Sequence, residues 1–137
     1  MFYVHDGVLL DPDLVPPQVF VETKGLVVDK HRILLPSYGG TQRWEVDGTN
    51  IPHSGDDAGT PDIYVIPEFT QQGGNILQFF IDLYNVRTSK QKFQIRVEIH
   101  QADYEPDVLF DESGELGPKK GERTESYGVF VPLRLME

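Results

Sequence analysis

The chain has 137 residues and a formal net charge of −10 at pH 7, from 22 acidic and 12 basic side chains. A chain this acidic repels the phosphates of nucleic acids and the surface of anionic membranes, so neither is expected as a partner. It contains no cysteine, which excludes disulfides, thiolate metal sites and cysteine nucleophiles. The length fits a single domain over residues 1–137 that can fold without cross-links.

Residues 1–17 are expected to form an N-terminal arm and a proline-rich connector. Two short apolar runs flank the turn-forming sequence His5-Asp6-Gly7, and three prolines follow within residues 12–17. No secretion signal is recognised, and no apolar run is long enough to span a bilayer. We therefore expect a soluble chain of unknown localisation, with the cytoplasm as the default.

Short runs of β-forming residues then follow in close succession, at 18–22, 26–28, 32–35, 42–47 and 62–66. In the run 42–47 apolar and polar residues alternate, and Trp44 is expected to face the core. Residues 47–61 are rich in Gly, Pro and Asp, which predicts the longest loop of the chain.

The two strongest strand signals lie at 76–86 and 93–100. In the second run Phe93, Ile95, Val97 and Ile99 share one face, while the other face is polar. In the first run Leu77, Phe79, Ile81 and Leu83 share one face, and the opposite face also carries apolar side chains, namely Phe80, Tyr84 and Val86. The five-residue link 87–91 predicts that both strands pair as an antiparallel hairpin in the middle of one sheet.

The C-terminal third is expected to hold a short strand at 107–110, a mobile polar excursion at 111–124 and a last strand at 128–135. Pro132 lies inside the last strand, which indicates an edge or a bulge there.

No helical periodicity is found, and 10 prolines and 13 glycines are spread over the chain. The fold class predicted is all-β, an antiparallel β-sandwich of about seven to nine strands with essentially no helix. Immunoglobulin-like and jelly-roll topologies both fit the pattern. The residues expected to be buried together are Trp44, Phe79, Ile81, Phe93, Ile95, Val97 and Val131.

No catalytic, cofactor-binding or metal-binding residue is predicted. His5, His31, His53 and His100 are too scattered for a local metal motif, and they are interpreted as surface or loop residues. No serine or glycine motif indicates a hydrolase or a nucleotide site. The acidic stretch from Asp103 departs from an EF-hand loop, because Val108 and Gly114 replace the required glycine and glutamate. A looser calcium site drawing on Asp56, Asp57, Asp103 or Asp107 is left open.

These patterns favour a non-catalytic interaction or assembly module, with a protein partner or a second copy of the chain at Phe80, Tyr84 and Val86. Such an apolar strand face is rarely left bare in a monomer. The alternative is a carbohydrate-binding or small-ligand-binding jelly roll with aromatic stacking residues such as Tyr84 or Trp44.

Overall fold

The computed structural model describes residues 1–11, 13, 16–36, 43–51, 61–67, 75–118, 120 and 124–136. They contain ten strands and no helix, and so nothing helical that could cross a membrane. The strands are β1 (Phe2–Val4), β2 (Val8–Leu10), β3 (Gln18–Gly25), β4 (Val28–Pro36), β5 (Arg43–Asn50), β6 (Asp62–Val65), β7 (Asn75–Tyr84), β8 (Gln91–His100), β9 (Asp107–Leu116) and β10 (Thr124–Leu135). The predicted all-β sandwich is confirmed, with slightly more strands than expected.

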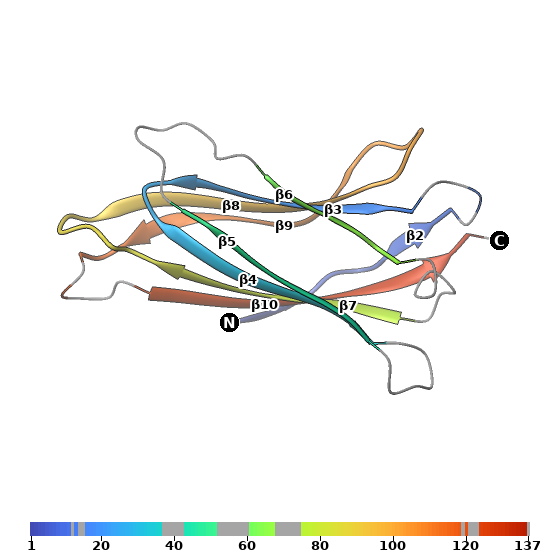
Figure 1. The fold of residues 1–137 in the computed structure, drawn as a ribbon, viewed down its shortest axis with the longest axis horizontal. Helices are drawn as coiled ribbons and strands as arrows, with labels where there is room; N and C mark the ends of the chain where they lie inside the picture. The colour runs from blue at the N-terminus through green and yellow to red at the C-terminus, as the bar shows by residue number, and fades with distance from the viewer. Residues whose placement is uncertain are drawn as a thin grey trace.

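The strands form two packed sheets (Figure 1). Sheet A has the order β1-β10-β7-β4-β5, with β2 also on β10, and sheet B has the order β6-β3-β8-β9. When the two sheet orders are read from the same side of the sandwich, they give four pairs of strands: β10 with β9, β7 with β8, β4 with β3, and β5 with β6. The two strands of each pair lie in different sheets and follow each other in the chain. Such a pairing of chain neighbours across a core resembles the winding of a jelly roll. An immunoglobulin domain orders its strands differently.

The predicted hairpin between the two longest strand signals is wrong. β7 pairs with β10 and β4 in sheet A, whereas β8 pairs with β3 and β9 in sheet B. The link between them crosses from one sheet to the other, and the apolar faces of β7 and β8 meet across the core. Both strands are central, as expected, but loop length alone does not decide whether a short link joins neighbours in one sheet or spans two sheets.

The link is held by Asn85, which is fully buried. Its amide Nδ2 donates to the carbonyl oxygens of Ser89, Leu116 and Gly117, at 2.9, 3.3 and 2.6 Å. Its Oδ1 accepts from the backbone N–H of Arg87 at 2.8 Å. One side chain therefore ties the crossover to the end of β9.

The N-terminal arm belongs to sheet A, because β1 and β2 both pair in parallel with β10. The backbone N–H of Gly128 and the carbonyl of Phe130 bond to this arm, so alternate residues of β10 point their backbone groups toward it. Pro132 falls on the same side but has no N–H to donate. The arm breaks opposite it, with three residues between β1 and β2 against two on β10. Pro132 marks this bulge, and β10 itself is not an edge.

The core lies between the two sheets and includes six of the seven residues predicted for it, while Trp44 is only partly buried and packs against it. β9 continues to Leu116, so the expected short strand at 107–110 is too short. Apolar periodicity is lost there because Gly114 occupies an inward position, where a Cβ would meet the ring of Phe93 at 3.2 Å. Polar β9 residues are nevertheless paired to β8 throughout.

Candidate functional site

The outer face of sheet A carries three phenylalanine rings, from Phe2 on β1, Phe80 on β7 and Phe130 on β10, which we call the phenylalanine patch. The rings of Phe2 and Phe80 each lie 6.1 Å from that of Phe130. Gly128 lies between Phe2 and Phe80 in the strand register, and a Cβ there would come within 2.7 Å of the Phe2 ring. The missing side chain lets the rings close over the sheet.

The patch is open to solvent. Phe2 is 73% exposed and Val4, its neighbour on the same face, is 78% exposed, while Phe80 and Phe130 are half-buried. A shallow hollow of about 130 Å³ beside it is lined by Met1, Phe2, Phe80, Asp82, Ser126, Tyr127 and Gly128. An exposed aromatic cluster of this kind is typical of a contact surface.

The three predicted interface residues do not form one surface. Phe80 lies within the phenylalanine patch, but Tyr84 is separated from it by the row in which Ser126 donates to Asp82 at 2.6 Å. Tyr84 instead lies under the ammonium group of Lys30, 5.5 Å from the ring centroid. Val86 is exposed but lies beyond the end of β7.

Sequence reasoning missed Phe2 and Phe130. For Phe130 a signal existed, because the alternation of Val129 and Val131 on the inner face places it on the outer one. Phe2 could not be placed, since only the parallel pairing of β1 with β10 brings it onto this face.

A second group of polar side chains is buried at the β5/β6 side of the sandwich. Asp29 of β4 has no exposed side-chain surface. Its Oδ2 accepts from Thr23 Oγ1 at 2.9 Å and from Asn50 Nδ2 at 3.1 Å, and it lies 3.3 Å from His31 Nδ1. A carboxylate oxygen only accepts hydrogen bonds, so Nδ1 carries the proton in this contact.

The other side of the His31 ring faces β6. Its Nε2 lies 2.7 Å from the hydroxyl of Tyr64 and 3.5 Å from Asp62 Oδ2. Burial, and then the charges of Asp62, Asp29 and Asp47, raise the pKa of Tyr64 from 10.0 to about 12. The phenol therefore stays protonated at neutral pH and can donate a hydrogen bond to Nε2 of His31.

Gly48 makes this arrangement possible. It pairs with His31 across β4 and β5, and a Cβ at this position would overlap with the Tyr64 hydroxyl and the His31 ring. The interpretation of His31 as a surface or loop residue is thus wrong. The sequence did contain a signal, because Asp29 and His31 continue the inward alternation of Ile33 and Leu35. With the His31 and Asp29 side chains fully buried, the group stabilises the fold.

The other histidines differ. His5 accepts from the backbone N–H of Gly7 at 2.9 Å, and His100 stacks on Phe20 at 3.9 Å between ring centroids. Both are half-buried near the surface, as predicted. His53 lies outside the described residues.

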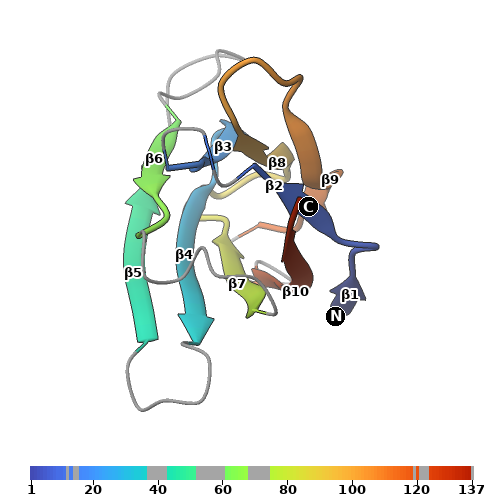
Figure 2. The same ribbon diagram turned by 90° about the vertical axis from the view of Figure 1, so that its right-hand side faces the viewer.

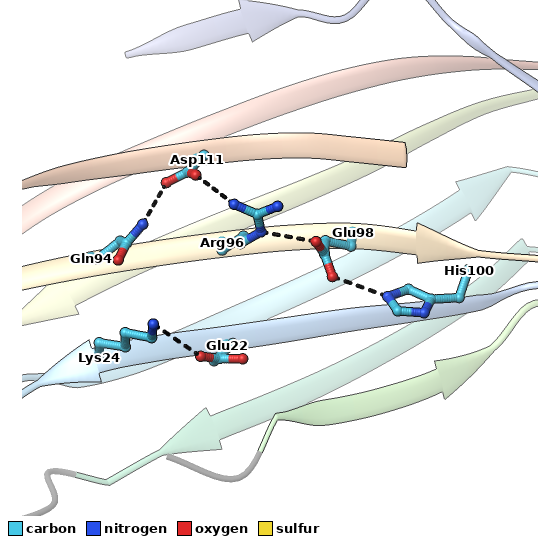
Figure 3. A network of polar contacts seen from close by, with 7 residues as sticks. All are labelled: Glu22, Lys24, Gln94, Arg96, Glu98, His100 and Asp111. Atoms are coloured by element: carbon cyan, nitrogen blue, oxygen red, sulfur yellow. Dashed lines mark hydrogen bonds and ion pairs between the residues drawn. The ribbon is translucent and has the colours of Figure 1, made fainter. Parts of the chain in front are cut away.

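The outer face of sheet B carries a polar network along β3, β8 and β9 (Figure 3). Arg96 is its centre, donating to Glu98 at 2.8 Å and to Asp111 at 2.9 Å. Gln94 also donates to Asp111, and His100 Nε2 lies 3.0 Å from Glu98. Five of the residues line a shallow hollow of about 260 Å³, namely Glu22, Lys24, Gln94, Arg96 and Glu98.

The network sets the charges on this face. Hydrogen bonding to Glu98 raises the pKa of Arg96. Partial burial would raise the pKa of Glu98, but the hydrogen bonds from Arg96 and His100 outweigh it, so that pKa is lowered. Both groups therefore stay ionised around neutral pH and could bind polar or zwitterionic groups.

The described residues give no support to the looser calcium site that the sequence left open. Within the described ranges no three His, Asp or Glu side chains come together as a metal site. Asp103 and Asp107 are both exposed, and Asp56 and Asp57 lie outside the described residues.

Comparison with models of protein families, with curated proteins and with solved structures found no match to this chain.

Proposed function

We propose that this chain is a non-catalytic protein-interaction module, and that the outer face of sheet A contacts a second protein chain. The phenylalanine patch supports this proposal most directly. Two half-buried rings and one exposed ring form a rigid apolar anchor, and aromatic anchors dominate the binding energy of protein interfaces. A second copy of the chain is the simplest partner, because a twofold axis can place the same face on both sides of an interface.

The test is the concentration dependence of the mass in solution, measured by light scattering. The variant Phe2→Ser with Val4→Ser removes the two most exposed apolar side chains of this face without opening the core. We expect the wild type to associate and the variant to remain monomeric over the same concentration range.

A matched variant, Ile63→Ser with Val65→Ser, removes two exposed apolar side chains from β6 at the edge of sheet B. It should associate like the wild type. The proposal fails if the wild type is monomeric and Phe80→Ser lowers its stability sharply, because the chain would then cover the patch by itself.

A small-ligand function is the second candidate, and the hollow on sheet B favours it. Carboxylate, amide and guanidinium groups converge there from β3 and β8, as in sites that bind polar ligands such as carbohydrates. A glycan array checks this function. Binding should be lost in Arg96→Ala and kept in Phe2→Ser, and an array without any bound glycan would argue against a carbohydrate ligand.

A further inference from the structure

The two long sides of the sandwich differ. Figure 2 shows β5 and β6 along one side, and β9 and β1 along the other. The β5/β6 side is filled by the contact of His31 with Tyr64. On the other side the edges leave a groove of about 320 Å³, which we call the β1/β9 groove. It is lined by Tyr3, Val4, His5, Val108, Leu109, Phe110, Asp111, Glu112 and Val129.

The groove has an apolar floor. The ring of Tyr3 lies 5.3 Å from that of Phe110, and both lie within 6.3 Å of the ring of Tyr127. Beside this floor runs β9, the last strand of sheet B, which pairs with β8 on one side only. Within the described residues, the backbone groups on the other side of β9 have no strand partner. Unpaired groups of an edge strand are the template to which an extended chain adds.

The register of β9 is suited to such an addition. A bulge interrupts it opposite Val97 and Glu98, but from Phe110 to Leu116 the pairing with β8 is unbroken. That is seven residues, about the length of an ordinary strand.

The charged side chains of β9 indicate which kind of segment would pair with its free edge. β9 carries four carboxylates, of Asp107, Asp111, Glu112 and Glu115, and no basic residue. Asp111 is paired with Arg96, whereas the other three have no hydrogen bond or ion pair within the described part of the chain. Glu112 faces the groove, where burial and then the charges of Glu125 and Glu112 raise the pKa of Tyr127.

We propose that the free edge of β9 binds an extended basic segment of another protein, in which apolar and basic residues alternate. The backbone of the segment pairs with residues 110–116, and its apolar side chains lie on the inner face, over the rings of Tyr3 and Phe110. Its basic side chains then lie on the outer face, beside Asp111 and Glu115, which pair with Arg96 and Lys92 of β8. A second copy of this chain does not fit, because pairing β9 with β9 places carboxylates against carboxylates. This site is separate from the phenylalanine patch.

The probe is a synthetic eight-residue peptide of alternating valine and lysine with blocked ends, titrated by calorimetry. We expect binding that weakens with added salt, and no binding of the matching valine and glutamate peptide. Two peptides methylated on the two alternate sets of backbone nitrogens should differ. Methylation of the set that faces β9 removes the donors that pair with it and should abolish binding, whereas methylation of the other set should leave binding intact. Binding of both methylated peptides as tightly as the unmodified peptide would overturn the proposal, since charge attraction alone would then explain it.

The residue test is Glu115→Lys, on the outer face of β9, with Asp47→Lys as its matched control. Both substitutions change the net charge equally, but Asp47 is exposed on β5, on the opposite side of the sandwich. We expect Glu115→Lys to weaken binding of the valine and lysine peptide by about tenfold or more, and Asp47→Lys to leave its affinity nearly unchanged. Equal weakening in both variants would mean that only the net charge matters and would overturn the site.

Hydrogen exchange locates the site, since added peptide should protect backbone amides of residues 110–116. The experiment also separates this site from the proposed function. In Phe2→Ser, which changes the phenylalanine patch but no residue that lines the β1/β9 groove, the peptide should still bind, even if association through the patch is lost. Protection of β1 or β7 without β9 would contradict the proposal.

Discussion

Asp29 places a carboxyl group at an inward-facing, fully buried position of β4. It occupies a position that an aliphatic residue would take in the alternation of β4, and its carboxylate is stabilised by contacts from three strands. Removing one partner of such a buried group leaves the others unpaired, which costs more than the group itself contributes.

Asp29→Ala should therefore lower the free energy of unfolding by about 3 to 5 kcal/mol. Thr23, Asn50 and His31 would each lose an acceptor. Urea denaturation followed by fluorescence measures the change. Asp47→Ala, at an exposed position of β5, is the control and should stay within about 0.5 kcal/mol. Similar losses of unfolding free energy in both variants would mean that the buried carboxylate of Asp29 stabilises the fold no more than an exposed one.

Tyr64 gives a prediction at high pH. Its pKa is raised from 10.0 to about 12 in the folded chain, so its contribution to stability is fully present below pH 10 and is lost as the pH rises to 12. The difference in unfolding free energy between wild type and Tyr64→Phe should be constant up to pH 10 and then shrink. Tyr127, whose pKa burial also raises, is present in both proteins and cancels. A constant difference up to pH 12 would contradict the assignment.

At the scale of the strands, β7 has two apolar faces with different roles. Phe79 is buried in the core, whereas Phe80 lies half-buried on the outer face of sheet A. Phe79→Ala should cost about 3 to 5 kcal/mol, because it leaves a cavity between the sheets. Phe80→Ala should cost about 1 kcal/mol, because only part of its ring leaves water on folding. Equal losses in thermal or urea unfolding would mean that the register of β7 is wrong.

The crossover from β7 to β8 depends on Asn85. Asn85→Ala removes three donated hydrogen bonds and one accepted bond, and it should cost about 1 to 3 kcal/mol. Amide exchange in the link and at the end of β9 should rise with it. Thr88→Ala, at an exposed position of the same link, serves as the control and should change neither measurement. Unchanged exchange in Asn85→Ala would show that the link is held by other contacts.

For the molecule as a whole, the charge of −10 opposes compaction. Salt screens repulsion between exposed carboxylates over a Debye length of about 10 Å at 0.1 M. Raising sodium chloride from about 10 to 150 mM should therefore increase the melting temperature, by about 3 to 5 °C for each kcal/mol gained. Calorimetry at fixed pH measures the shift. A lower melting temperature in salt would mean that the ion pairs around Arg96 outweigh the repulsion.

The sequence by itself determined the class of fold and the identity of the core. Period-2 alternation around Phe79 and Phe93 is a local property, because successive side chains of a strand point to opposite faces. The same alternation placed Trp44 and Val131 correctly and would have placed His31, had it been extended back from Ile33.

Only the tertiary structure decided which strands are neighbours. Whether β7 pairs with β8, and what lies opposite Pro132, depends on contacts between residues far apart in the chain. The surfaces follow from those pairings. Phe2 meets Phe130, and β9 becomes a free edge, because sheet order brings distant segments together or leaves them unpaired. Alternation within one strand carries no information about that order.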